Sequence, residues 1–185
     1  CAKAGAERVE VYGANVASEE QVLACMQQIA ADFGAINGLV NNAGITRDAL
    51  MLKYKDGALV SKMTLEQWQS VIDVNLTGAF LCGREAAEKM IELNCEGCKA
   101  GVEAMAVVWA KELARYGIRA ASVAPGFIAT EMVMSMKEEA REKIAASIPA
   151  QRLGEPDEIA KAVEFIFEND YVSGRCIEVD GALRL

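Results

Sequence analysis

The chain has 185 residues, of which 52% are hydrophobic and 25% charged, a balance typical of a single soluble globular domain. Its 27 acidic residues outnumber 19 basic ones, and the net charge of −8 without a basic stripe argues against nucleic acid and anionic membranes as partners. The apolar runs are far shorter than a membrane span, and the first residues lack the apolar core of a signal peptide.

The cysteines argue against a metal site. The chain has six cysteines and no histidine, which excludes the zinc sites that mix both residue types. Cys95 and Cys98 form a single CxxC pair without a second one, so a four-cysteine zinc site is not expected either. Cys25 and Cys82 occupy helical patterns, where a free buried thiol is the plainer interpretation. We therefore predict no bound metal and a reducing, cytoplasmic environment.

The first third of the chain has the rhythm of a strand, a helix and a second strand. Residues 8–12 alternate apolar and polar side chains and predict a short strand. Ser18 and Gln21 predict a capping box that begins a helix, and Gly34 ends it. Residues 38–42, GLVNN, then predict a strand. The apolar face of the helix is formed by Val22, Met26, Ile29 and Phe33.

A hairpin and a long helix follow. Asp56-Gly57 lies between two partly alternating runs and predicts a type I′ hairpin over residues 50–63, a small excursion from the main sheet. Thr64 and Gln67 predict a second capping box, and the helix it begins runs to about residue 93, with an irregularity over residues 75–78. The expected buried face consists of Leu65, Trp68, Val71 and Ile72.

The remainder predicts helices alternating with strands. We expect a helix over residues 99–116, then a strand over residues 118–124. Short helices follow at about residues 137–146 and 156–169, before a last strand at residues 175–179. This alternation predicts an α/β fold with a doubly wound, Rossmann-like parallel sheet, forming a single domain over the whole chain.

One interruption breaks the alternation. Only NCEGC separates the helix that ends near residue 93 from the helix expected to begin at residue 99, and we expect no strand there. Because parallel strands need long crossover connections, we infer that a strand and its loop, on the order of twenty residues, are missing between about residues 94 and 99. The chain also begins without Met, so we interpret it as an incomplete or spliced form of a longer protein.

Four segments, taken together, resemble the short-chain dehydrogenase/reductase family. They are Asn15-Val16, Asn41-Asn42-Ala43-Gly44, Lys99-Ala100-Gly101 and Pro125-Gly126-Phe127-Ile128-Ala129-Thr130. The phrases NNAGITRD, APGFIATEM and RLGEPDEIA are similar to the bacterial β-ketoacyl-acyl-carrier-protein reductases within this family. The resemblance covers nearly the whole chain. It implies an enzyme that transfers a hydride between a nicotinamide cofactor and a carbonyl carbon.

The resemblance also assigns cofactor-binding residues. In open parallel sheets, ligands bind beyond the carboxyl ends of the strands, where Asn15, Asn41 and Pro125 are expected to lie along one rim. By resemblance, Asn15 and Val16 contact the adenine. The implied positions along the rest of the cofactor are Asn41, Ala43 and Gly44 beside the adenosine, and Pro125, Gly126, Ile128 and Thr130 beside the nicotinamide and a phosphate.

Two catalytic residues are implied. Asn75 corresponds to the family's asparagine, whose helix kink holds a water on the proton relay; a polar residue that merely bends the helix is the alternative. Lys99 corresponds to the lysine that binds the nicotinamide ribose and lowers the pKa of a tyrosine four residues earlier, although a solvated lysine fits the residue pattern as well. Cys95 stands at that earlier position here, and the family's serine is also absent. We do not transfer the tyrosine's role to Cys95.

The resemblance leads to a functional hypothesis. The protein uses NADP or NAD, with NADP favoured, to reduce a 3-oxoacyl thioester, bound to an acyl carrier, or a similar small ketone. It is expected to be a cytoplasmic homotetramer. Residues 131–152, with Met132, Met134 and Met136, suit a substrate lid, although a surface helix is the plainer interpretation. The family's N-terminal glycine-rich βαβ part is missing from the chain, and a catalytically inactive nucleotide-binding or scaffolding protein is the alternative.

Overall fold

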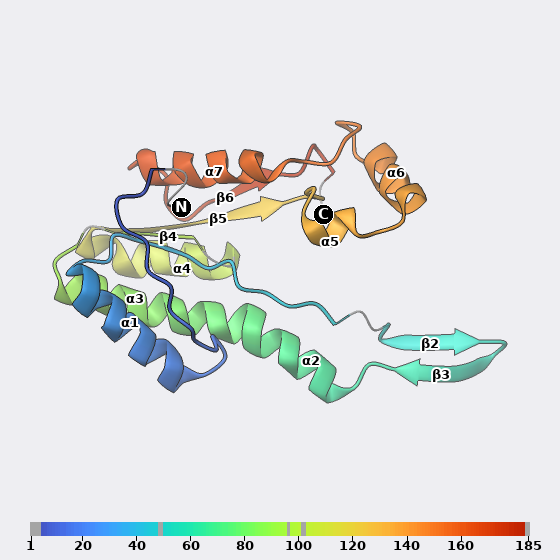
Figure 1. Ribbon diagram of the computed structural model, residues 1–185, viewed down its shortest axis with the longest axis horizontal. Coiled ribbons are helices and arrows are strands. Elements are labelled where there is room, and N and C mark those ends of the chain that lie inside the picture. The colour runs from blue at the N-terminus through green and yellow to red at the C-terminus, as the bar shows by residue number, and fades with distance from the viewer. Residues whose placement is uncertain (1–4, 48–49, 96, 101–102, 184–185) are drawn as a thin grey trace. The chain divides into compact units, whose positions relative to one another are not determined.

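The computed structural model describes residues 5–47, 50–95, 97–100 and 103–183 (Figure 1). Contacts group the chain into two compact units. The first consists of Cys1–Ile36 and Asn42–Lys89, and the second of Asn37–Asn41 and Met90–Leu185. Among the helices within the described ranges, none combines the length and apolarity that a bilayer span requires.

Helix α1 (Glu19–Phe33) opens the first unit and confirms the predicted helix. The Ser18 side chain accepts a hydrogen bond from the Gln21 backbone at 3.4 Å, and Gly34 ends the helix in the left-handed conformation with φ of 72°. Val22 and Met26 are buried as expected. Phe33, on the same apolar face, is 42% exposed.

The predicted strand at residues 8–12 is wrong. This segment has no strand conformation and lies against the end of α1. Arg8 donates to the Asp32 carbonyl at 2.7 Å and covers the Phe33 ring at 4.4 Å, and the Tyr12 hydroxyl donates to the Asp32 carboxylate at 2.7 Å. A strand forms only beside another strand, and these side chains find their partners on a helix instead.

The hairpin prediction is confirmed. Strands β2 (Leu52–Lys55) and β3 (Ala58–Lys62) pair antiparallel, with an irregularity between Lys53 and Tyr54. Asp56 and Gly57 both have positive φ, 51° and 79°, as a type I′ turn requires.

A continuous helical rod follows the hairpin. It consists of α2 (Leu65–Ile72), the π-helical segment η2 (Asp73–Gly78) and α3 (Ala79–Glu92). The predicted capping box at Thr64 is present, and η2 confirms the expected irregularity. The predicted burial of Leu65 and Trp68 is wrong, since they are 77% and 55% exposed. Sequence periodicity correctly located the helix, but it could not show that no element within the described ranges buries this part of its apolar face.

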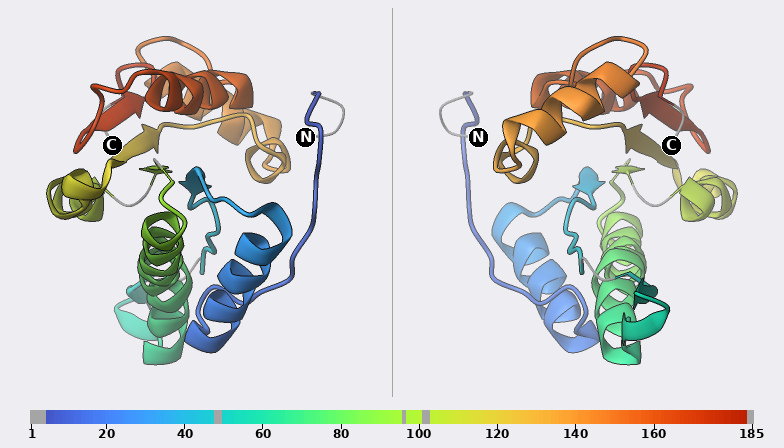
Figure 2. Two further views of the ribbon diagram at one scale, coloured as in Figure 1. Left: turned by 90° about the vertical axis from the view of Figure 1, so that its left-hand side faces the viewer. Right: turned by 90° about the vertical axis from the view of Figure 1, so that its right-hand side faces the viewer.

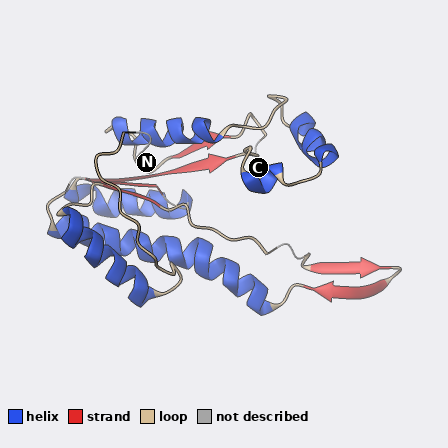
Figure 3. Ribbon diagram, in the orientation of Figure 1, coloured by secondary structure: helices blue, strands red, loops and turns tan. Residues whose placement is uncertain are grey.

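The second unit contains the parallel sheet. Its strands are β1 (Gly38–Val40), β4 (Gly97–Ala100), β5 (Ile118–Pro125) and β6 (Cys176–Val179), in that spatial order and all parallel. Figures 1 and 2 show helix α7 (Pro156–Glu168) on one face and helix α4 (Glu103–Leu113) on the other. Figure 3 distinguishes these two helical layers from the strands between them. The doubly wound, Rossmann-like arrangement is confirmed.

Strand β4 overturns two expectations. We expected no strand here and a helix beginning at Lys99, but Lys99 lies within β4, paired with Leu39 on β1 and Ala120 on β5. Helix α4 begins only at Glu103 and supplies the crossover from β4 to β5. Gly97–Ala100 contains no β-branched or aromatic residue, so neither periodicity nor composition indicated a strand.

The other elements agree with the predictions, except that the short helix α5 was not predicted. A 3-10 turn (Ala114–Tyr116) ends α4 at Gly117, which has φ of 70°. Two short helices follow β5, α5 (Glu131–Met134) and α6 (Glu138–Ser147). Ala121 and Ile166 form the centre of the core between β5 and α7, where Val123, Phe167, Val172 and Ile177 pack against them.

Candidate active site

Asn75 fixes the turn that follows the NNAG motif. Its side-chain oxygen accepts from the Ile45 N–H at 2.8 Å, and its side-chain nitrogen donates to the Ile45 carbonyl at 3.0 Å. Thirty residues of chain separate the two partners. The amide group of asparagine is the short side chain that can accept from an N–H and donate to a C=O at once. Asn75 therefore connects η2 to the chain directly after Gly44.

Gly78, at the end of η2, lies against the predicted adenine-contacting segment. A Cβ atom at Gly78 would come within 2.8 Å of the Val16 side chain and 3.2 Å of its carbonyl oxygen. The Asn15 side-chain oxygen accepts from the Ala17 N–H at 3.0 Å, which makes a local turn. The remaining amide nitrogen of exposed Asn15 has no hydrogen-bond partner among the residues described.

The first unit thus gathers its predicted site residues along η2. Val16 contacts Gly78, and the side-chain oxygen of Asn75 lies 3.6 Å from where a Cβ atom at Gly44 would be. A π-helical turn inserts an extra residue and displaces backbone groups from the regular helical pattern, a distortion common at functional sites. Asn15 directly precedes Val16 in the chain, and Ala43 directly precedes Gly44.

The second unit places Asn41 and Pro125 at one edge of the sheet. Asn41 directly follows β1, and Pro125 is the last residue of β5. Because β1, β4 and β5 are parallel, both residues lie at the carboxyl edge, where open sheets of this kind bind ligands. This part of the expected rim is present. Asn15 belongs to the first unit, so its place along the rim stays a prediction.

Gly126 allows β5 to approach the chain that follows β6. Its N–H donates to the Val179 carbonyl at 3.0 Å. A Cβ atom at Gly126 would lie 2.7 Å from the Asp180 Cα and 3.0 Å from the Asp180 carbonyl oxygen. Both obstacles are backbone atoms, which cannot rotate away. Glycine is therefore required at this position by the fold itself, independently of any ligand.

The loop beyond Gly126 is held by a short parallel bridge to Gly154. The Ala129 N–H donates to the Gly154 carbonyl at 2.8 Å, and the Gly154 N–H donates to the Phe127 carbonyl at 2.9 Å. The Ile128 side chain is buried, so only its backbone can face a ligand. Neither the Ile128 N–H nor the exposed Thr130 hydroxyl has a hydrogen-bond partner in the described ranges.

An ion pair that the sequence interpretation missed supports this bridge. Arg152 donates two hydrogen bonds to the Glu158 carboxylate, at 2.7 and 2.6 Å. Glu158 also accepts from the Glu155 N–H at 2.8 Å in a capping box at the start of α7. The Arg152 guanidinium and the backbone donor together lower the pKa of Glu158 to about 2. The signal was present in RLGEPDEIA, where two glutamates three residues apart flank a proline.

Lys99 is placed in a strand rather than at a helix start. Its backbone pairs with β1 and β5 in the middle of the sheet. The structure therefore does not reproduce the position, one helical turn after a tyrosine, that the resemblance implies. Cys95, four residues earlier, is half-buried, and its thiol hydrogen bonds to the Leu93 carbonyl at 3.7 Å. A catalytic role for Lys99 stays a prediction.

The predicted lid segment is anchored at its two ends. Ile148 is 2% exposed and packs against Gly181, and the Ala150 N–H donates to the Gly181 carbonyl at 3.2 Å. Between Thr130 and Ile148 lie α5 and α6. The methionines of this stretch are exposed, by 66% at Met132, 49% at Met134 and 41% at Met136.

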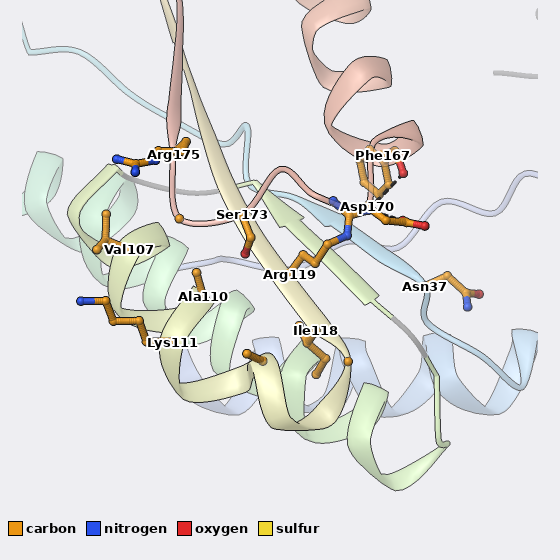
Figure 4. A pocket seen from close by; sticks show the side chains of 13 residues that line it. Asn37, Val107, Ala110, Lys111, Ile118, Arg119, Phe167, Asp170, Ser173 and Arg175 are labelled. Atoms are coloured by element: carbon orange, nitrogen blue, oxygen red, sulfur yellow. Dashed lines mark hydrogen bonds and ion pairs between the residues drawn. The ribbon is translucent and has the colours of Figure 1, made fainter.

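A large cavity lies at the opposite edge of the sheet (Figure 4). It has a volume of about 950 Å³ and surrounds the start of β5. Arg119 crosses it and donates to the carbonyls of Ile166 and Phe167 in the last turn of α7, and to those of Asn169 and Val172 in the chain that follows, at 2.7 to 3.2 Å. Arg119 thus caps a helix C-terminus. A smaller cavity of about 270 Å³ lies beside Ile128 at the carboxyl edge.

The described residues contain no group of cysteine and carboxylate side chains that could hold a metal ion. The four cysteines whose side chains the structure describes are free thiols: Cys25, Cys82, Cys95 and Cys176. Burial raises the pKa of the Cys25 and Cys82 thiols, which makes them less reactive as thiolates.

Residues 1–97 match the family model described as short chain dehydrogenase, and residues 94–183 match one described as enoyl-(acyl carrier protein) reductase. The chain belongs to the short-chain dehydrogenase family. It is therefore an oxidoreductase by family, as the resemblance implied.

Curated relatives of this short-chain dehydrogenase carry related names. It is 37% identical over 199 residues to 3-oxoacyl-[acyl-carrier-protein] reductase FabG of Thermotoga maritima, covering 95% of this chain and 77% of the relative. It is 36% identical over 203 residues to a 3-oxoacyl-[acyl-carrier-protein] reductase of Synechocystis, with 97% and 77% covered. It is also 37% identical over 193 residues to the Synechocystis acetoacetyl-CoA reductase, with 91% and 77% covered.

A solved structure has the same fold. This short-chain dehydrogenase superposes on the structure titled "ElxO with NADP Bound" with a TM-score of 0.83 and 25% sequence identity. The match covers 94% of this chain and 77% of the other. It agrees with the doubly wound arrangement of β1, β4, β5 and β6.

Proposed function

We propose that the protein reduces a 3-oxoacyl thioester to the 3-hydroxyacyl thioester with NADPH. The observation that carries this proposal is the double hydrogen bond from Asn75, in a π-helical turn, to the backbone of Ile45. It couples the catalytic asparagine position to the NNAG turn, the two features that the family resemblance assigns to catalysis and to the cofactor. Relatives at 36–37% identity are named for this reaction and for acetoacetyl-CoA reduction.

The described residues provide groups that fit parts of the cofactor. At the carboxyl edge, the Ile128 N–H and the Thr130 hydroxyl suit a carboxamide and a phosphate. In the first unit, the free amide nitrogen of Asn15 and the side chain of Val16 suit a purine. When bound, the nicotinamide supplies the hydride for the carbonyl carbon. The bound form of the structural neighbour favours NADP over NAD.

The proton for the carbonyl oxygen must come from a group that this chain does not show. The aligned stretch with the Thermotoga relative, 199 residues, is longer than the whole chain of 185 residues, so that relative carries residues without a counterpart here. The two family matches meet at residues 94–97. Both findings support an internal segment missing near there, with the serine and tyrosine expected from the resemblance. In the longer form, Lys99 would follow this tyrosine by four residues.

The segment between Thr130 and Ile148 is proposed as the substrate lid. Exposed methionines are flexible and apolar, which suits an acyl chain of variable length. Anchors at Gly154 and Gly181 leave α5 and α6 as the parts that can move. The acyl carrier or coenzyme would stay outside this lid.

The test uses the protein encoded by the complete gene, with loss of reduced-nicotinamide absorbance as the measurement. We expect turnover of 3-oxoacyl thioesters with NADPH and slower turnover with NADH. Replacement of Lys99 by Ala should lower kcat by about 100-fold or more, within the range of general acid–base effects, whereas fluorescence should show weaker NADPH binding. No turnover with any ketone or thioester, together with intact NADPH binding, would favour the inactive nucleotide-binding alternative.

We also propose a homotetramer. Exposed apolar side chains on the long helices, Trp68 and Phe80 in the first unit and Val107 and Val108 in the second, are surfaces that a partner subunit could bury. Light scattering on the full-length protein should give four times the mass of one chain.

A further inference from the structure

The cavity around the start of β5 lies within the second unit and away from the candidate active site. Its volume of about 950 Å³ is within the range of pockets that bind small organic molecules. Gly117 and Ile118 line it at the beginning of β5, whereas Asn41 and Pro125 lie at the carboxyl edge of the sheet. The reaction proposed above therefore makes no use of this cavity.

One wall of the cavity is the loop directly before β6, which β5 holds in place by hydrogen bonds. The Gly174 N–H donates to the Ala120 carbonyl at 2.6 Å. The Ser173 hydroxyl accepts from the Ala120 N–H at 3.3 Å, and the Ser122 N–H donates to the Arg175 carbonyl at 3.0 Å. Because these bonds fix the loop to the strand, the wall is already formed, and a ligand would not have to order it on binding.

A second wall is helix α4, which contributes small side chains. Ala110 and Ala114 line the cavity one helical turn apart. Gly174 approaches this helix so closely that a Cβ atom there would lie 3.2 Å from the Ala110 Cβ. Ile118 and Phe167 add larger apolar surface. The body of a bound molecule would therefore contact mainly apolar groups.

Two cationic side chains that line the cavity have no partner among the described residues. Lys111 is in the last turn of α4 and Arg175 directly precedes β6, and neither side chain forms an ion pair or a hydrogen bond there. Figure 4 shows both on the same side of β5. The third cation, Arg119, is already occupied, because it caps α7 and lies 3.4 Å from the Asp170 carboxylate. A lysine near a helix C-terminus also favours the helix dipole, but that role leaves Arg175 unexplained.

We propose that this cavity binds a small organic anion with an apolar body. The carboxylate or phosphate of the ligand would accept hydrogen bonds from Lys111 and Arg175, and its apolar part would lie beside Ala110, Ala114 and Ile118. The chain as a whole has a net charge of −8, so an anion is held here by these two cations at short range rather than by the overall field. The proposal does not depend on the reaction proposed above.

The test is isothermal titration calorimetry of the full-length protein with decanoate and with decyl phosphate. Both are used below the concentration at which they form micelles, with NADPH added to occupy the candidate active site. We expect saturable binding of at least one of them, and the tighter one identifies the head group. Decanol and decyltrimethylammonium carry the same chain without an anion and should bind about tenfold more weakly or less, because they cannot accept charge-assisted hydrogen bonds.

Substitution of the two cations makes the test specific. The double variant Lys111→Glu, Arg175→Glu should raise the Kd of the anion about tenfold or more, since hydrogen bonds to charged groups are among the strongest. Lys111→Gln with Arg175→Gln removes the charges without reversing them and should weaken binding in the same direction. Circular dichroism verifies that each variant is folded.

The matched control reverses two exposed lysines at α6, Lys137→Glu and Lys143→Glu, and changes the net charge equally. It should alter the Kd by less than about threefold, because charges farther away than a Debye length are screened. Three outcomes would overturn the proposal: no saturable binding of either anion, equally tight binding of decanol, or an unchanged Kd in both double variants of Lys111 and Arg175.

Discussion

The candidate site residues of the first unit and those of the second unit are held in place by different means. In the first unit, one side chain fixes the turn: Asn75 makes both hydrogen bonds to the backbone of Ile45. In the second unit, glycine fixes the loop: Gly126 admits the backbone of Asp180 at a distance that no side chain would allow. The first arrangement depends on which atoms a side chain carries, and the second on the absence of a side chain. Substitutions at Asn75 and at Gly126 should therefore affect the protein differently.

The largest effect is expected for Gly126→Ala. The new Cβ would meet the Cα and carbonyl oxygen of Asp180, and the backbone would have to move. We expect the free energy of unfolding to fall by about 3 kcal/mol, the upper part of the range for overpacking. Urea denaturation measures this change. Gly13→Ala is the matched control, because a Cβ there meets no atom within 4 Å, and it should stay near wild type.

A smaller loss of stability is expected for Asn75→Ala. It leaves the N–H and carbonyl of Ile45 without their side-chain partner, a loss of about 2 kcal/mol. Asn75→Asp keeps the acceptor for the Ile45 N–H but not the donor, and should fall between the two. Activity should drop more than stability, which a comparison of kcat with urea midpoints would reveal. Equal stability of all three proteins would contradict the role assigned to Asn75.

The smallest effect on stability is expected from protonation of Glu158, which forms an ion pair with Arg152 near the loop that follows Gly126. Arg152 lowers the pKa of Glu158 to about 2, from an ordinary value of 4.5. The folded state therefore gains stability from this carboxylate above the ordinary pKa, and loses it as pH falls from about 4.5 through 2. Carbon-13 NMR of the carboxyl group should show ionised Glu158 at pH 3. Arg152→Ala should return the pKa toward its ordinary value; an unchanged titration would show that Arg152 is not its cause.

Much of the architecture could be predicted because it depends on local rules. The caps at Ser18, Gly34 and Thr64, and the positive φ angles of Asp56-Gly57, follow from which residues satisfy helix ends and tight turns. The π-helical irregularity was also indicated locally, by an asparagine followed by Thr-Gly within a helix. These features need no knowledge of distant parts of the chain.

The predictions that were wrong concern residues whose structure depends on segments that are close in space but distant in the sequence. The segment at residues 8–12 alternates like a strand but has no ladder, and Gly97–Ala100 has no strand composition but lies between two strands. Trp68 has the periodicity of a core residue but is 55% exposed, with no element among the described residues burying it. For the site, motifs identified the NNAG turn and the Pro125-Gly126 loop. The partner of Asn75 could not be read from the sequence, because thirty residues separate it from Ile45.

The Arg119 cap described at the large cavity has a mechanical consequence. Arg119 ties the start of β5 to the last turn of α7, while Gly154 ties the loop after β5 to the chain leading into the first turn of α7. β5 and α7 are therefore connected near both of their ends, and we expect them to move together as one rigid body. If the proposed lid between Thr130 and Ile148 opens, its movement should then come from backbone rotation near Thr130 and Ile148, while β5 and α7 keep their positions.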